Sequence, residues 1–495
     1  MKKFIPYLIC LVLFTVFCCG IYGPVFLHLS QENYFAFDSE AMAFVLREPL
    51  GTLYWISRFL MLPLQNQWIG GIYLAILLTL LTWFTDRTLR VSSKWYGIGA
   101  LLPACILIWA VSRGYNLFMR SEPSKVVFYI YVFLLLTGVL ALVISLFFKK
   151  KTSAEKSFKW PVGLLCPILI LVLLNVGAWI YRQNLILSCD MQNKLLIADW
   201  DGMIEDALKA KNPDKSIAAF HAIALNQKGQ LLEKMFEIDY DFPLTKLDDK
   251  DGLDESENFT VECNLFSCLP QPAYHYALCQ QVVEGPRLRF LKMMIICSAL
   301  QQEDALCSRY LAFLDKMPFQ HEFVEMWKRR LENPQLTAED PTMARILQQV
   351  SFEDGFENDY ARPCYIGFNL GVRRATPETL KASMAAALYC KDLDNVIFRA
   401  AYLKQIEALP TYVQEALVVA SAKRPEILQQ FPEISDMMKI RVSSFANEAS
   451  PYLEQVDTSE VYEALYEKWG NSFLYYYYFG NRNRAVQDGF VTAVN

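Results

Sequence analysis

Residues 126–148 read VVFYIYVFLLLTGVLALVISLFF, and residues 160–181 read WPVGLLCPILILVLLNVGAWIY. Neither stretch contains an acidic or basic residue. A helix of about 20 apolar residues is long enough to cross the hydrocarbon core of a bilayer. Both stretches therefore predict transmembrane helices.

Three further uncharged apolar runs precede these two, at residues 4–29, 68–84 and 95–112. The last is the weakest of the five, because Gly97, Gly99 and Pro103 are poor helix formers. The first follows a short basic start, as a signal peptide would, but lacks a small-residue cleavage site and is read as a retained anchor. We expect five transmembrane helices, because five such runs would leave a soluble protein little polar surface.

The charge of the chain divides at the same place as its hydropathy. Residues 1–181 carry 15 lysines and arginines against 7 aspartates and glutamates, whereas residues 182–495 carry 32 against 45. This asymmetry predicts a transmembrane domain at 1–181 and a separate acidic domain at 182–480, with a tail at 481–495. We expect no nucleic-acid partner, because an acidic domain repels phosphates.

The basic residues also predict the orientation in the membrane. With the N-terminus in the cytoplasm, the cytoplasmic segments hold 10 lysines and arginines and the outer loops hold 5. Lysine and arginine near span ends tend to stay cytoplasmic. We therefore expect an inner-membrane protein with a periplasmic C-terminal domain, and the opposite orientation is the alternative.

Apolar residues after Arg182 recur every three or four positions, which predicts helices and an all-α fold. Residues 198–213, 301–318 and 390–410 share a polar junction, an apolar helix and a proline, which is similar to the second helix of a tetratricopeptide unit. We expect an array of helical hairpins, with an irregular helical domain as the alternative. Residues 239–264 are acidic, do not match calcium-loop spacing, and predict a solvated loop.

The first outer loop holds the candidate catalytic residues, Asp38 and Glu40. Polytopic glycosyltransferases that act on lipid-linked sugars keep a catalytic carboxylate in such a loop. The favoured interpretation is simpler: both carboxylates are solvated, and Asp38 caps a helix. Residues 49–64 follow them and are apolar and aromatic, as in a helix that lies in the membrane interface.

Two other features predict contacts rather than catalysis. Tyr475, Tyr476, Tyr477 and Tyr478 cannot all face one core, so some of them could meet a partner. Cys263 and Cys268 are a close pair and a candidate disulfide. The four histidines do not pair at metal-ligand spacing, and no phosphate-binding glycine loop occurs, so we expect no metal and no cofactor.

Several short stretches resemble an uncharacterised family of Bacteroidota membrane proteins, which implies about five spans followed by an extracytoplasmic helical-repeat domain. They are Asp38-Ser39, Glu48-Pro-Leu-Gly51, Ser57-Arg-Phe-Leu60, residues 224–236, residues 310–319 and Trp469 to Phe479. Members of that family usually carry Gly-Gly after the loop proline, where this chain has Leu50-Gly51. The resemblance implies no activity.

The sequence thus favours a membrane-anchored scaffold whose outer helical array binds an envelope protein, as concave helical solenoids do. The first alternative is a membrane-embedded transferase for a lipid-linked or envelope glycan, with Asp38 or Glu40 as its carboxylate. The second is an accessory subunit of a transporter or channel. An enzyme is the less favoured class, and the expected partners are the bilayer and an envelope protein.

Overall fold

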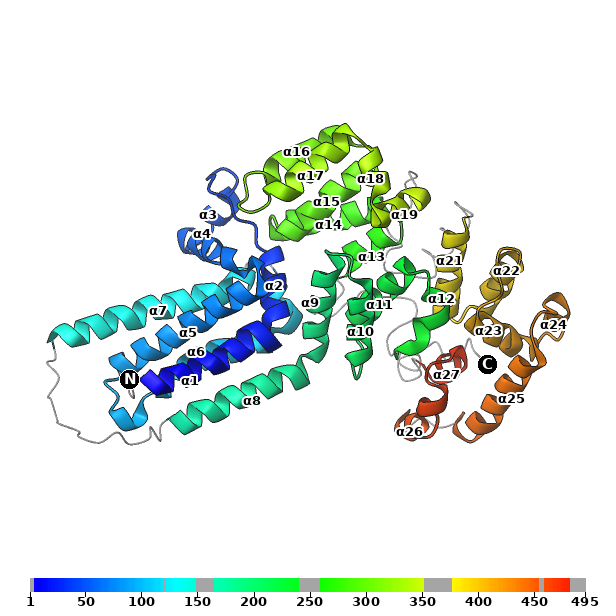
Figure 1. The fold of residues 1–495 in the computed structure, drawn as a ribbon, viewed down its shortest axis with the longest axis horizontal. Coiled ribbons are helices and arrows are strands. Elements are labelled where there is room, and N and C mark those ends of the chain that lie inside the picture. The colour runs from blue at the N-terminus through cyan, green and yellow to red at the C-terminus, as the bar shows by residue number, and fades with distance from the viewer. Residues whose placement is uncertain are drawn as a thin grey trace. The chain divides into compact units, whose positions relative to one another are not determined.

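The computed structural model describes residues 4–119, 122–147, 164–239, 259–350, 376–453 and 458–480. Every regular element in these ranges is a helix, which confirms the all-α prediction (Figure 1). The chain forms two compact units. Unit 1 contains Met1–Asn193, Leu278–Lys292 and Ser308–Lys328, and unit 2 contains Lys194–Ala277, Met293–Cys307 and Arg329–Asn495. The boundary at residue 181 between a transmembrane domain and a second domain stays a prediction.

Three helical segments in the described residues are long and apolar enough to cross a membrane. They are α5 (Gln67–Thr88), the run Ile98–Phe118 around α6 (Leu101–Arg113), and Pro123–Phe147 in α7 (Glu122–Phe147). The weak prediction at 95–112 is thus confirmed as a long apolar helical segment. Two of its glycines are required by the structure. Gly97 has a φ of 95°, which favours glycine, and a Cβ on Gly99 would lie 2.6 Å from the carbonyl oxygen of Thr82, which is too close.

The first and fifth predicted spans are each a pair of helices joined at a bend. The first pair is α1 (Ile5–Thr15), extended by the π-helical turn Val16–Ile21, and α2 (Gly23–Gln31); the second is α8 (Leu165–Tyr181) and α9 (Gln183–Leu195). The bends are 62° and 74°. A π turn followed by Pro24, which lacks an N–H, explains the first bend. Residues 4–29 are therefore not one straight helix, and counting both bent pairs gives up to five spans.

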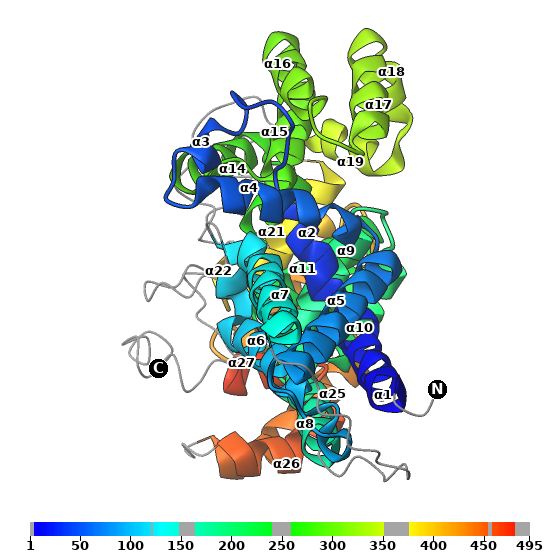
Figure 2. The ribbon, with the colours of Figure 1, turned by 90° about the vertical axis from the view of Figure 1, so that its left-hand side faces the viewer.

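Helix α5 is central to unit 1 and packs against α1, α6 and α7, which run alongside it (Figures 1 and 2). A Cβ on Gly71 of α5 would lie 2.5 Å from the Sγ of Cys19, so the glycine permits a close approach of the two segments. Near the end of α5, the Asp86 carboxylate accepts hydrogen bonds from the backbone N–H groups of Gly97 (2.6 Å) and Gly99 (2.8 Å). This carboxylate holds the turn before α6 in place.

The segment between α2 and α5 contains α3 (Ala43–Leu46), α4 (Gly51–Leu60) and a 3-10 turn (Leu62–Gln65). Helix α4 packs against α7, where the rings of Tyr54 and Phe128 stack at 5.0 Å. Its buried face carries Ser57 and Arg58, whereas large apolar side chains are exposed on the other face. The usual pattern of a soluble amphipathic helix is therefore reversed in α4.

Two segments from late in the chain belong to unit 1. They cover the end of α14 (Pro270–Glu284), the start of α15 (Leu288–Leu300), and most of α16 (Asp304–Leu314) and α17 (His321–Glu332). The ring of Phe313 stacks on that of Tyr34 at 5.0 Å. Gly285 has a φ of 89°, and a Cβ there would lie 3.0 Å from the ring of Phe44. Aromatic packing thus joins these segments to the segment between α2 and α5.

The helices of unit 2 pack both on their neighbours in sequence and on helices further along the chain. Helix α10 packs on α11, α21 on α22, α22 on α23, and α23 on α25 and α27. Their bounds are α10 (Trp200–Lys209), α11 (Lys215–Gln227), α12 (Leu231–Lys234), α13 (Thr260–Phe266), α18 (Gln335–Glu339), α19 (Pro341–Gln349), α21 (Pro377–Tyr389), α22 (Leu393–Leu403), α23 (Thr411–Ser421), α24 (Ile427–Gln430), α25 (Asp436–Ala449), α26 (Thr458–Trp469) and α27 (Phe473–Phe479).

One expectation for this unit needs correction. The acidic loop predicted at 239–264 ends earlier than expected, because Thr260–Phe266 form α13 and residues 259–262 are buried. Residues 240–258 of that loop lie outside the described residues. The apolar positions Val261 and Leu265, four residues apart, account for the helix, since both side chains are in the core.

Candidate functional site

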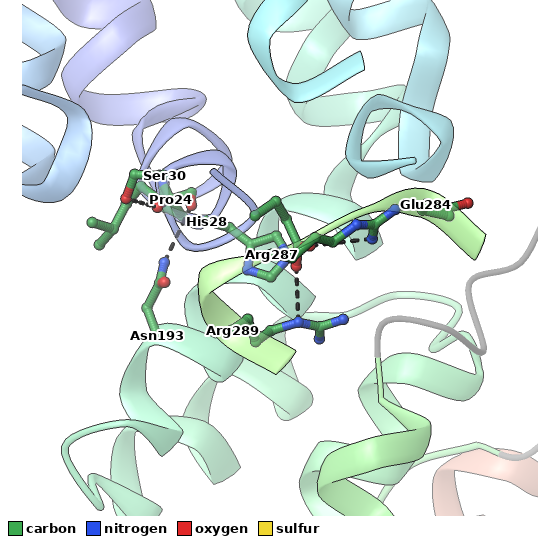
Figure 3. A network of polar contacts seen from close by, with 9 residues as sticks. Pro24, His28, Ser30, Asn193, Glu284, Arg287 and Arg289 are labelled. Carbon is green, nitrogen blue, oxygen red and sulfur yellow. Dashed lines mark hydrogen bonds and ion pairs between the residues drawn. The ribbon is translucent and has the colours of Figure 1, made fainter. Parts of the chain in front are cut away.

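A buried cluster of charged side chains lies in unit 1 where α2 ends. Glu32, the residue after α2, lies 3.2 Å from the Nη1 of Arg287 and 2.8 Å from the Nε of Arg289. Both arginines come from the start of α15 (Figure 3). The three side chains are at most 6% exposed. Buried carboxylates and guanidiniums are costly unless they are paired, so this contact is specific to the folded unit.

Two further side chains complete the cluster. Glu284, at the end of α14, forms an ion pair with Arg287. The Nε2 of His28 lies 3.5 Å from Glu32, and the edge-on contact of its ring with Phe118 has a centroid distance of 4.5 Å. The cluster therefore joins residues from α2, from the end of α14 and from the start of α15.

The electrostatic balance of the cluster keeps Glu32 ionised. Burial raises the pKa of the Glu32 carboxyl, but the positive charges of Arg289 and Arg287 lower it more, so the pKa lies below its ordinary value. A carboxylate of this kind remains charged at neutral pH. It therefore accepts hydrogen bonds and is a poor proton donor.

A third buried arginine, Arg58, extends from α4 into the same part of unit 1. Its Nη1 donates a hydrogen bond to the carbonyl oxygen of Tyr34 (3.2 Å), and its own carbonyl accepts one from the side chain of Asn33 (3.0 Å). Burial, and then the charge of Arg287, lower the pKa of Arg58 to about 10. Arg58 is therefore still a cation at neutral pH, and it fixes α4 to the segment that follows α2.

This arrangement is suited to holding segments together. Each ionised group in the cluster faces a group of opposite charge or a backbone carbonyl, which leaves it in one defined geometry. Among the described residues, no group of three histidine, cysteine, aspartate or glutamate side chains is placed to hold a metal ion. The interaction that this cluster provides is ion pairing between parts of the chain that are distant in sequence.

The candidate catalytic residues, Asp38 and Glu40, lie near the surface, in the segment between α2 and α4. One oxygen of Asp38 lies 2.5 Å from the Nζ of Lys316, and the other accepts a hydrogen bond from the backbone N–H of Glu40 (2.9 Å). The hydrogen bond from Lys316 is the largest of the effects that lower the pKa of Asp38. The side chain of Glu40 is exposed. Both Asp38 oxygens are thus occupied, and the side chain forms a surface ion pair with α16–α17.

The tyrosine run is divided between the core and the surface of unit 2. Tyr475 and Tyr476 are buried, and the Tyr476 hydroxyl donates a hydrogen bond to the carbonyl of Tyr389 at 2.5 Å. Tyr477 is partly buried, and Tyr478 is 39% exposed. Tyr478 is therefore the member of the run that is most available to a partner.

Cys263 and Cys268 are both free thiols in the structure, and no disulfide joins them there. Cys263 lies in α13, and Cys268 follows the helix with a φ of 65°. Burial raises the pKa of the Cys263 thiol above its ordinary value, which makes its thiolate scarce and its reactivity low.

The sequence reasoning did not find Glu32, Arg58, Arg287 or Arg289. Each is a single charge beside an apolar run, and nothing in the spacing connects position 32 with position 287. A partial signal existed, because Arg287-Leu-Arg289 places two charges at the start of a helix that is apolar apart from Lys292 and Ser298. Such charges need partners if that helix is buried.

The fold and the buried cluster define an all-helical protein with three to five possible membrane spans and a structural charge cluster beside them. The chain belongs to the family described as "Family of unknown function (DUF6057)", which it matches over residues 1–136 and 114–480. No curated protein and no solved structure matches the chain.

Proposed function

We propose that the protein is a membrane-anchored interaction protein whose C-terminal helical unit binds an envelope protein. In this proposal the three long apolar helices and the two bent pairs form five crossings of the inner membrane. The N-terminus lies in the cytoplasm and unit 2 in the periplasm, as the positions of the lysines and arginines favour. Unit 2 then acts as a tetratricopeptide-like array.

The observation that carries the proposal is an exposed aromatic surface on α22. Phe398 and Tyr402 are 57% and 52% exposed, and Ile406, in the turn after the helix, is 51% exposed. They are four residues apart, so they follow one side of the helix, and the two aromatic rings lie 5.2 Å apart. The other side of α22 is buried. Large aromatic side chains on a surface are typical of protein-binding sites.

Helix α4 supports the membrane anchor. Leu53, Ile56 and Phe59 are each about 40% exposed and share one face of the helix. Arg58 points the other way, into the buried cluster. An apolar face of this kind is favourable when it lies in the interface of a bilayer and unfavourable in water. The predicted interfacial helix at 49–64 therefore has the surface that such a location requires.

Site-specific crosslinking in cells tests the partner. A photo-crosslinking amino acid at Tyr402 should capture one protein, and the double variant Phe398→Ser with Ile406→Ser should reduce its yield roughly tenfold. Leu208→Ser is the matched control, because Leu208 is 52% exposed on α10 of the same unit. Equal yields from the double variant and the control would disprove the role of this surface. Alkaline phosphatase fused after residue 480 tests the topology, since it is active only in the periplasm.

A further inference from the structure

An open groove with a volume of about 660 Å³ lies between α6 and α8 in unit 1. Ile108 and Val111 line it from α6, and Ile170, Leu173, Leu174 and Gly177 line it from α8. Its wall is almost entirely apolar, and Leu173 is 60% exposed. A surface of this kind needs an apolar occupant.

The α8 wall of the groove is about as long as one leaflet of a bilayer. It extends from Ile170 to Tyr181, which is about 16 Å at the helical rise of 1.5 Å per residue, whereas the α6 wall covers Ile108 to Ser112. The hydrocarbon core of a bilayer is about 30 Å thick, so the α8 wall spans about half of it.

Arg182 provides a fixed positive charge where the groove ends. Its Nε and Nη2 donate hydrogen bonds to the carbonyls of Val111 and Ser112, both at 2.9 Å. Gly114 makes room for the guanidinium, because a Cβ there would lie 3.2 Å from the Nη1 of Arg182. Within the described ranges no carboxylate pairs with Arg182, and carbonyl acceptors leave its net charge in place.

We propose that this groove binds one acyl chain of a phospholipid, with the lipid phosphate at Arg182. The apolar walls fit the chain, the length of the α8 wall fits one leaflet, and an arginine is well suited to a phosphate. The inference rests on the membrane placement in the proposed function, since α6 and α8 must face lipid. It adds a specific lipid to the proposed partners of the protein.

Gly177 offers a direct way to block the groove. A Cβ at this position would meet only the ring of Tyr181, at 4.0 Å, so a leucine fills open space without a clash. Gly138 on α7 is the matched control, because a Cβ there meets Phe84 at an ordinary 3.8 Å and lies outside the groove. Both variants replace a glycine within an apolar helix by the same residue.

The full chain is reconstituted in vesicles of phosphatidylethanolamine, phosphatidylglycerol and diacylglycerol, extracted into detergent, and examined by native mass spectrometry. We expect one retained phospholipid per chain in the wild type and in Gly138→Leu, and roughly tenfold lower occupancy in Gly177→Leu. In Arg182→Gln the groove should lose its preference for phospholipid over diacylglycerol, which has no phosphate.

Three results would overturn the proposal: equal retention in Gly177→Leu and Gly138→Leu, no retained lipid in the wild type, or a second copy of the chain bound in place of lipid. The membrane placement fails separately, because a chain that leaves the cell membrane fraction without detergent contradicts the proposed function itself.

Discussion

The Nη1 of Arg287 lies 3.2 Å from the Oε2 of Glu32, although 255 residues separate them in the sequence. Both side chains are buried. This contact joins the end of α2 to the start of α15 inside one compact unit. Residues that follow α2 are therefore packed against a segment from the middle of the chain.

Glu32→Gln should destabilise unit 1 strongly. The variant removes the negative charge beside the buried Arg287 and Arg289, and only the ion pair of Arg287 with Glu284 remains from the described cluster. Breaking a buried ion pair by removing one partner typically costs about 3–5 kcal/mol. The measurement is thermal unfolding of the detergent-solubilised chain, with Glu40→Gln as the exposed control. A melting temperature equal to that of the control would contradict the structural role of the cluster.

The same contact predicts a dependence of stability on pH. The pKa of Glu32 is lower in the folded unit than its ordinary value of 4.5. A carboxyl of this kind adds stability above its unfolded pKa, and this contribution is lost as the pH falls through the folded pKa. We expect the melting temperatures of wild type and Glu32→Gln to converge as the pH falls below about 4.5. A difference in melting temperature that stays constant over this pH range would show that the charge of Glu32 does not cause the difference in stability.

The helices were largely predictable from sequence because they depend on local composition. The run at 126–148 needs no partner to be recognised as a long apolar helix, and α7 covers most of it. The same is true of α11, since its apolar residues recur with the helical period.

The buried cluster was not predictable because it depends on contacts between distant residues. The 62° bend within residues 4–29 has a local signal in Gly23-Pro24, but the π turn before Tyr22 does not show in the apolar composition. Glu32 has no local feature that distinguishes it from a solvated loop residue. Asp86 is similar, since its acceptor role depends on the backbone of Gly97 and Gly99.

The variant Asp38→Asn tests whether Asp38 has a catalytic role in addition to its ion pair with Lys316. The pair with Lys316 is near the surface, where such contacts contribute little to stability, so we expect an unchanged melting temperature. We also expect the variant to complement a deletion strain as well as the wild type does, and Lys316→Gln to behave in the same way. Loss of complementation by Asp38→Asn and not by Lys316→Gln, at normal protein level, would favour the transferase alternative.

Leu50→Gly should stabilise the start of α4. Leu50 has a φ of 63°, in the left-handed region, which costs a residue with a side chain about 1–2 kcal/mol. Glycine relieves the strain, and its greater freedom in the unfolded chain offsets part of the gain, so we expect a net increase of about 0.5–1 kcal/mol. Leu50 is 62% exposed, so little packing is lost.

Leu50→Ala is the control, because it removes the side chain and keeps the strain. Gly51→Ala should have the opposite effect, because its Cβ would lie 2.3 Å from the carbonyl oxygen of Val45. Thermal unfolding of the three variants tests this order, and a Leu50→Gly variant less stable than Leu50→Ala would contradict the strain at this position.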